Sequence, residues 1–203
     1  MALSQEHVSG FTSLPWLPQA FINVVAGSGN DVAAILQQLA DSDSFWDSWD
    51  QVIRNAEPVP IEILDDNTFL AQEIELVHDL APNLSPAATT VLQMVIEQAA
   101  EAASRVNRFP DGQAVRARIR DLAEQLDAEQ VAGEPNSPSW LRSFGRAVSV
   151  LAGATIVMAD VPAVAGGGIP ALASFPVGMA GIAAGTFDDP AAARDFLRAR
   201  RPR

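Results

Sequence analysis

Glu75 and His78 are the residues whose types and spacing come closest to a metal ligand set. A Glu-x-x-His pair on a helix places both side chains on one face, which is the arrangement of helical-bundle di-iron sites. Such a site needs a second copy of the pair, and the only other histidine, His7, lies in an irregular N-terminal segment. We therefore predict no metal site, and we interpret His78 as a surface or boundary residue.

Two acidic segments partly match cation-binding motifs. Segment 41–50 opens with alternating aspartates like a calcium-binding loop, but Phe45 replaces the third ligand and Trp46 replaces the required glycine. The Asp65-Asp66 pair lacks the third aspartate of the prenyl-diphosphate metal motifs, because Phe69 stands in its place. We interpret the aspartates of 41–50 as charges on a solvated face at the start of a helix.

The composition excludes several classes of enzyme. The chain has no cysteine and no tyrosine, and all 13 of its cationic side chains are arginine. It therefore has no thiol nucleophile, no zinc-thiolate site, no Schiff-base lysine and no Walker A lysine. The Gly-Ser-Gly turn at 27–29 lacks the G-x-S-x-G spacing of a nucleophile elbow. We expect no cofactor and lean towards a non-enzyme; an enzyme would need a polar pocket containing Glu75, His78 and Glu97 or Glu101.

Apolar side chains recur at helical spacing from residue 30 to residue 131, which predicts an all-α fold. Residues 21–25 fit either a short strand or a helical turn. The expected helix starts carry capping residues or follow a turn; they are Asn30 or Asp31, Ser44 in a capping box with Asp47, Thr68, Ser85-Pro86, and the turn at 110–112.

Two groups of apolar side chains in this region are expected to be buried. Trp46 and Trp49 predict a core face, with an exposed ridge for a protein partner as the alternative. The second group repeats at four-three-four spacing and predicts an antiparallel seam with the helix expected at 85–108; it consists of Val115, Ile119, Leu122 and Leu126.

The distribution of charge and a helix-breaking segment divide the chain into two parts. Residues 1–140 hold six arginines and 21 acidic residues, a net charge of −15, whereas residues 141–203 hold seven arginines and four acidic residues, a net charge of +3. The Gly- and Pro-rich segment 133–138 cannot continue a helix, so we predict a boundary at residue 136. The acidic helical body, residues 1–136, would repel nucleic acid. Because the chain opens without a secretory signal pattern, we expect a cytoplasmic location.

Residues 147–187 contain a single charged side chain, Asp160. We predict a hydrophobic hairpin in residues 137–203, with apolar helices at 143–159 and 170–187 and Asp160 in the turn between them. Arg142 and Arg146 precede the hairpin, and a short amphipathic tail helix with further arginines is expected to follow it. Basic flanks on both sides suit a hairpin that contacts the inner face of the cell membrane.

The second apolar helix carries Gly178, Gly181 and Gly185 on one face, and the Gly181-to-Gly185 spacing permits close helix contact in lipid. We predict that the hairpin associates with a membrane or with copies of itself, and that Gly181→Arg abolishes this association. The candidate association residues are Leu151, Ile156, Val157, Phe175, Gly178, Gly181, Ile182 and Gly185.

Two functions are compatible with this organisation. In the first, the hairpin of a non-enzymatic helical protein mediates membrane association or self-assembly, as in an effector or an anchored regulator. This layout resembles pore-forming helical domains, in which amphipathic helices surround an apolar hairpin, and the resemblance is architectural only. In the second, the chain is a soluble helical scaffold or adaptor, with the hairpin in its core or in an oligomer interface. The first function predicts that residues 1–136 stay folded without the hairpin.

Overall fold

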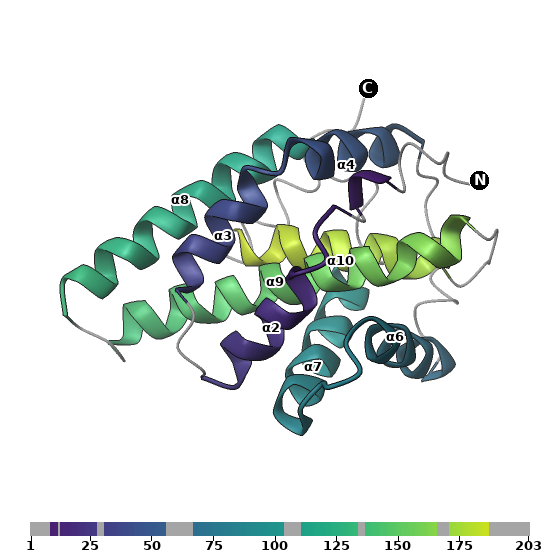
Figure 1. Cartoon of the computed structure of the whole chain (residues 1–203), viewed down its shortest axis with the longest axis horizontal. Helices are drawn as coiled ribbons and strands as arrows, with labels where there is room; N and C mark the ends of the chain where they lie inside the picture. Colours follow the sequence, from purple (N-terminus) through teal and green to yellow (C-terminus); the bar gives the residue numbers. More distant parts are fainter. Residues whose placement is uncertain are drawn as a thin grey trace.

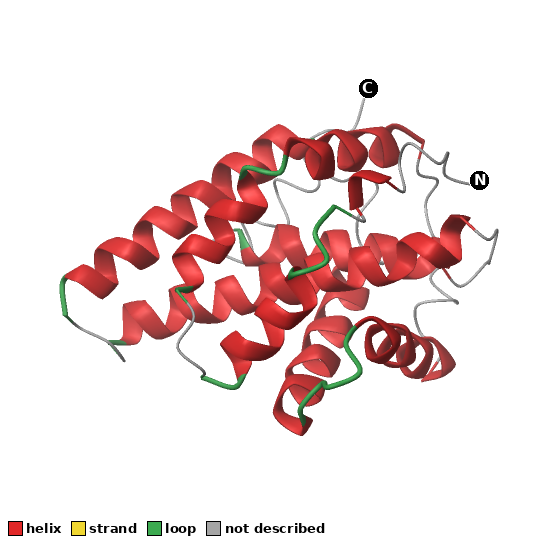
Figure 2. Ribbon diagram, in the orientation of Figure 1, coloured by secondary structure: helices red, strands yellow, loops and turns green. Residues whose placement is uncertain are grey.

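The computed structural model describes residues 9–11, 13–27, 31–55, 67–103, 111–133, 137–165 and 171–186, and these residues contain no strand. The prediction of an all-α protein is confirmed (Figure 2). The expected tail helix lies outside the described residues. In chain order the helices are α2 (Leu17–Val25), α3 (Val32–Ala40), α4 (Asp43–Asn55), α6 (Asn67–Leu80), α7 (Pro86–Ala103), α8 (Gly112–Val131), α9 (Pro138–Ala165) and α10 (Ala171–Gly185).

Four helices begin at a side chain that accepts a hydrogen bond from a backbone amide of the first turn, which supplies an acceptor that the helix itself lacks. Two of these caps were predicted: Asp31, with Asn30 as the alternative, and Ser85. The sequence pattern at 110–112 predicted only a turn. The four bonds run from Ala34 N to Asp31 Oδ1 (3.1 Å), Ala88 N to Ser85 Oγ (3.1 Å), Ala114 N to Asp111 Oδ1 (2.9 Å) and Trp140 N to Ser137 Oγ (3.1 Å).

In the N-terminal part, the structure decides between strand and helix at residues 21–25 and corrects the predicted start of the next but one helix. Residues 21–25 belong to α2, with Pro18 in its first turn and Gly27 just beyond its end at φ 70°. Glycine suits that position because other residues are strained in the left-handed region. The capping box at Ser44 is wrong, because α4 begins at Asp43 and Ser44 lies within the helix.

Helices α9 and α10 lie side by side through the middle of the molecule, and the other helices cover them (Figure 1). Helix α8 contacts α3, α4 and α9 on one side of this central pair. Helices α6 and α7 contact each other and the central pair on another side, and α2 crosses α9. Side chains from all of these helices join one hydrophobic core.

The partner predicted for the apolar stripe of α8 is wrong, although its burial is confirmed. Leu122 and Leu126 are buried, as are the other two stripe residues. They face α3, α4 and α9, the helices with which α8 makes its main contacts, and not the preceding helix α7. The apolar spacing defines a buried face but carries no information about which helix covers it.

Helix α9 is longer than the sequence pattern predicted. It continues through Asp160 and Pro162 to Ala165, so the expected break at 160–162 is wrong. A proline in the last turn of a helix removes a single intrahelical hydrogen bond, and the helix tolerates that loss better there than at its centre. The residues that connect α9 to α10, 166–170, lie outside the described part of the chain.

The tryptophans of α4 are core residues, as the sequence analysis favoured. Trp46 and Trp49 are fully buried, with their ring centroids 5.4 Å apart, and Phe45 packs edge-on against Trp46. The indole Nε1 of Trp46 donates a hydrogen bond to the carbonyl oxygen of Leu39 (3.0 Å), which satisfies its polar atom. The alternative, an exposed protein-binding ridge, is wrong.

Candidate functional site

The central helices α9 and α10 approach so closely that three glycines of the contact have no room for a side chain. A Cβ atom added at Gly153 would lie 2.6 Å from the Gly178 carbonyl oxygen, and one at Gly178 would lie 2.8 Å from the Gly153 oxygen. At the other end, a Cβ at Gly185 would lie 2.7 Å from the Arg146 oxygen. Because the residue numbers run in opposite directions along the contact, the two helices are antiparallel.

Gly181 faces α7 as well as α9. A Cβ at Gly181 would lie 3.3 Å from the Gly153 Cα, 3.4 Å from Val95 Cγ1 and 3.7 Å from Ala99 Cβ. A methyl group at this position requires only a small adjustment, whereas an arginine side chain has no space inside the folded protein. Gly181→Arg would therefore disrupt the fold whether or not the hairpin associates with anything, and it does not test the association.

Polar side chains of α9 bind the C-terminal carbonyl groups of α10. Arg146 donates from Nε to the Gly185 oxygen (3.1 Å) and from Nη2 to the Thr186 oxygen (3.0 Å), and Ser149 Oγ donates to the Gly181 oxygen (3.1 Å). A cation at a helix C-terminus satisfies carbonyl groups that have no partner within the helix. Arg146, predicted only as a charge flanking the hairpin, thus joins the two helices.

The predicted association residues whose side chains are described lie inside the protein. Leu151, Ile156, Val157 and Ile182 have no exposed surface, and the three predicted glycines are also buried. The Phe175 side chain lies outside the described part of the chain. Their use in association therefore stays a prediction, and it requires a state in which these helices are uncovered.

The sequence analysis named Val157 of α9, which lies against Gly178, but missed the small residues on the α9 side of this contact. Ser149 and Gly153 are four residues apart and face α10. Ser149 contacts the Gly181 carbonyl oxygen through its hydroxyl group, and Gly153 packs directly against the α10 backbone. A search for small residues at four-residue spacing in the first apolar helix, and not only in the second, would have found them.

Within the described residues, one helix has the length and composition to cross a membrane: α9, over Pro138–Ala159. In the folded protein, 67% of the most apolar 18-residue stretch of this helix is buried. The central helix of a soluble bundle meets the same criterion, so the criterion alone does not separate the two functions considered.

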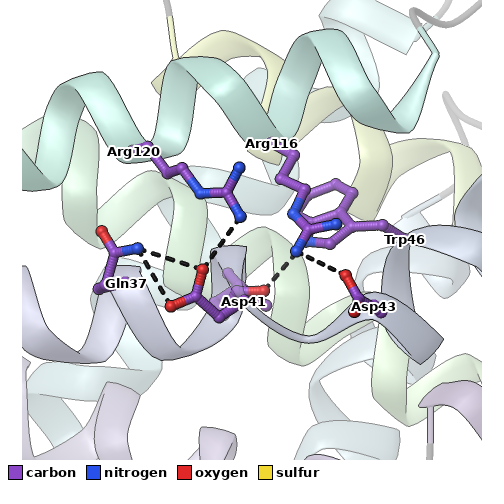
Figure 3. A network of polar contacts seen from close by, with 7 residues as sticks. Gln37, Asp41, Asp43, Trp46, Arg116 and Arg120 are labelled. Atoms are coloured by element: carbon purple, nitrogen blue, oxygen red, sulfur yellow. Dashed lines mark hydrogen bonds and ion pairs between the residues drawn. The ribbon is translucent and has the colours of Figure 1, made fainter.

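Charged contacts hold the corner between α3 and α4 against α8 (Figure 3). Arg116 Nη2 lies 2.6 Å from Asp43 Oδ1, and Arg120 Nη2 lies 3.0 Å from Asp41 Oδ1. Gln37 Nε2 also donates to both carboxylate oxygens of Asp41, at 3.2 and 3.1 Å. The hydrogen bonds from Gln37 and then Arg120 lower the pKa of Asp41 below its ordinary value.

Of the residues singled out for catalysis or metal binding, Glu75, His78 and Glu97 have described side chains, and the Glu101 side chain lies outside the described part. Glu75 and Glu97 are exposed, and His78 is partly buried. The Glu97 carboxylate accepts a hydrogen bond from Gln93, one turn earlier on α7 (3.1 Å). No group of three or more histidine and acidic side chains able to hold a metal ion occurs among the described residues.

Comparison of the chain with protein-family models, with curated proteins and with solved structures gives no match.

Proposed function

We propose that this chain is a non-enzymatic helical protein that stores an apolar hairpin, residues 147–187, in its interior and uses it to associate with a membrane. In this proposal residues 1–136 form an acidic helical body around the hairpin, and a short amphipathic tail helix follows it. An effector or an anchored regulator at the inner face of the cell membrane fits this description.

The observation that carries the proposal is the backbone contact between α9 and α10 at Gly153, Gly178 and Gly185. In lipid, helices associate through close packing of small residues and interhelical hydrogen bonds, because no hydrophobic driving force acts between them. A pair built in this way is suited to remain paired after transfer from a protein interior into a bilayer.

The distribution of charge supports the same function. The helices that cover the pair belong to the part of the chain with a net charge of −15, and the arginines that flank the hairpin belong to the part with a net charge of +3. Anionic lipids attract the second part and repel the first. An anionic bilayer therefore favours separation of the hairpin from its covering helices.

A soluble scaffold or adaptor is the second candidate function. The observation that favours it is the 67% burial of the most apolar window of α9, which a permanent core helix would also show. In that function the hairpin stays in the interior and another surface of the bundle binds the partner.

A reversible disulfide between α7 and α10 separates the two functions. The chain contains no cysteine, and the distance from Ala99 Cβ to an added Cβ at Gly181 is 3.7 Å, close to the usual separation of about 3.8 Å across a disulfide. In the double variant Ala99→Cys/Gly181→Cys, oxidation ties α10 to the covering helix α7, and reduction releases it.

We expect the wild-type chain and the reduced double variant to become resistant to carbonate extraction after incubation with anionic vesicles. The oxidised double variant should remain extractable, and each single-cysteine variant under the same oxidant should behave like the wild type. If the wild-type chain itself never becomes carbonate-resistant, the scaffold function replaces the membrane function. Equal insertion by the oxidised and reduced forms would show that α10 does not leave α7.

A further inference from the structure

We propose that α6 and α7 form a lid over the stored hairpin, and that this lid opens first, while α3, α4 and α8 still cover α9. The lid consists of Asn67–Leu80 and Pro86–Ala103. Its purpose, to uncover α10, rests on the proposed membrane function. Its opening is a property of the folded protein and can be measured without lipid.

Helix α7 is the covering helix that packs on α10. Apart from α9, it is the helix with which α10 makes its main contacts. A Cβ at Gly181 would lie 3.4 Å from Val95 Cγ1 and 3.7 Å from Ala99 Cβ, so this face of α10 is turned towards α7 as well as α9. Helix α6 packs on α7 and α9 on the same side of the central pair (Figure 1). Movement of α6 and α7 is therefore the smallest rearrangement that uncovers the Gly181 face of α10.

The lid is anchored by fewer large apolar side chains than the covering helices on the other side of the pair. Among its described leucine, isoleucine and aromatic side chains, Leu92 and Ile96 are at most 1% exposed, whereas Leu80 is 37% exposed. Helices α3, α4 and α8 contribute seven such side chains that are at most 1% exposed, and three of them are the aromatic rings of α4. Burial stabilises by about 25 cal/mol per Å² of apolar surface, so separating the lid costs less free energy than separating α3, α4 and α8.

Polar contacts also tie the other covering helices to one another. The Asp50 carboxylate on α4 accepts a hydrogen bond from the Gly112 amide at the start of α8, a group that has no acceptor within its own helix. A Cβ at Gly112 would lie 3.2 Å from the Trp46 carbonyl oxygen, so α4 and α8 are in close contact there. The two arginine–aspartate pairs lie further along α8 (Figure 3). We therefore expect α3, α4 and α8 to stay together as one block when the lid opens.

The test is the rate at which buried thiols react with a small thiol reagent, in a chain that has no cysteine of its own. Val77→Cys on α6 and Val115→Cys on α8 are a matched pair, because neither valine has exposed surface. Ala99→Cys on α7 and Ala123→Cys on α8 are a second pair, at positions 1% and 3% exposed. A buried thiol reacts when its surroundings open, so its rate relative to the unfolded chain measures the free energy of that opening.

In native buffer without vesicles, we expect each lid thiol to react at least about tenfold faster than its partner on α8. Urea should accelerate the lid thiols less steeply than the α8 thiols, because opening of the lid exposes less surface than global unfolding. Urea unfolding of each variant corrects these rates for any change in global stability. A chain whose lid thiols react fast but that never becomes carbonate-resistant would keep the lid and lose the membrane function.

Amide hydrogen exchange of the Ala99→Cys/Gly181→Cys variant gives a second measurement. In the reduced form, amides of α7 should exchange faster than those of α8, because they exchange through opening of the lid. Oxidation joins α7 to α10, so this difference between α7 and α8 should disappear.

Three results would overturn the lid. The first is equal reaction rates within each matched pair, with the urea dependence of global unfolding, which would show that the bundle opens as a whole. The second is faster reaction of the α8 thiols, which would place the opening on the other side of the central pair. The third is a difference in exchange between α7 and α8 that persists after oxidation, since α7 would then open without leaving α10.

Discussion

Gly145 and Gly153 lie two turns apart on α9 and differ completely in their surroundings. A Cβ at Gly145 would meet nothing within 4 Å, whereas one at Gly153 would meet the Ile182 backbone nitrogen at 2.6 Å. Gly178, the partner across the contact, is equally restricted. The same residue type therefore serves close approach at two positions and has no packing role at the third.

Alanine substitutions at these glycines should move stability in opposite directions. Gly145→Ala should stabilise the protein by about 0.5–1 kcal/mol, because alanine is the better helix former. Gly153→Ala and Gly178→Ala should each destabilise it by about 1–3 kcal/mol or more, because the added methyl group meets backbone atoms that cannot give way. Urea unfolding measures all three. A Gly178→Ala variant as stable as Gly145→Ala would contradict the close contact.

The Asp41 carboxylate provides a prediction of pH dependence. Its pKa in the folded protein is below the ordinary value of 3.8, chiefly because Gln37 and Arg120 donate hydrogen bonds to its ionised form. A lowered pKa stabilises the folded state at pH values above 3.8, and this contribution is lost as the pH falls through the folded-state pKa. Asp41→Asn should thus lower Tm at pH 7, and the difference from wild type should disappear in strong acid.

Calorimetry at several pH values would follow this difference, with Asp127→Asn as a control at another exposed carboxylate of the chain. Salt should also reduce the effect of Asp41→Asn, because the Arg120 pair is solvent-exposed. A difference in Tm that persists unchanged at low pH would mean that Asp41 acts through something other than its ionised form.

At the scale of elements, α8 depends on burial of its apolar stripe. Leu122 is 1% exposed, and truncation to alanine should cost about 2–5 kcal/mol, because it leaves a cavity where α8 faces its neighbouring helices. Val131→Ala, at an exposed site on the same helix, should change stability by less than about 0.5 kcal/mol. Chemical denaturation of both variants checks this. A small effect of Leu122→Ala would place the stripe in solvent.

Helix starts could be predicted from the sequence, and helix partners could not. A cap such as Asp31 or Ser85 acts on an amide three residues away, so the cause and its effect lie in the same short segment. The partner of Leu122 lies on helices far away in the sequence, and apolar periodicity is the same whichever helix covers it. The glycine face of α10 was predicted from its local spacing, and the same spacing at Ser149 and Gly153 was present in α9 but was not searched for; that these two faces meet could not be predicted from either helix alone.

At the scale of the molecule, the position of α9 and α10 between the other helices changes the expected result of a deletion. The sequence analysis predicted that residues 1–136 stay folded alone. In the structure α8 and its neighbours lie on one side of the central pair, and α6 and α7 lie on another. Removal of residues 137–203 would expose the faces that these helices turn towards the pair.

We therefore expect residues 1–136 alone to retain helix but to lose cooperative unfolding and to bind the dye ANS, as molten globules do. The membrane function would then leave the body in this loosened state once the hairpin is released, and not folded as the sequence analysis predicted. Near-ultraviolet circular dichroism would follow the packing of Trp46 and Trp49, with the full-length chain as the reference. A sharp thermal transition in the fragment would restore the prediction that the acidic body folds independently.

The central place of α9 and α10 also determines when a growing chain can form its core, because these two helices are synthesised last of those described. At about 5–20 residues per second, residues 137–186 leave the ribosome over about 3–10 s, after α2 to α8 have already emerged. During that interval the earlier helices expose apolar faces, because α9 and α10, against which these faces pack in the finished protein, have not yet been synthesised. The nascent protein is therefore a natural client for chaperones that hold amphipathic helices, and a pause in translation before residue 137 would lengthen that exposure.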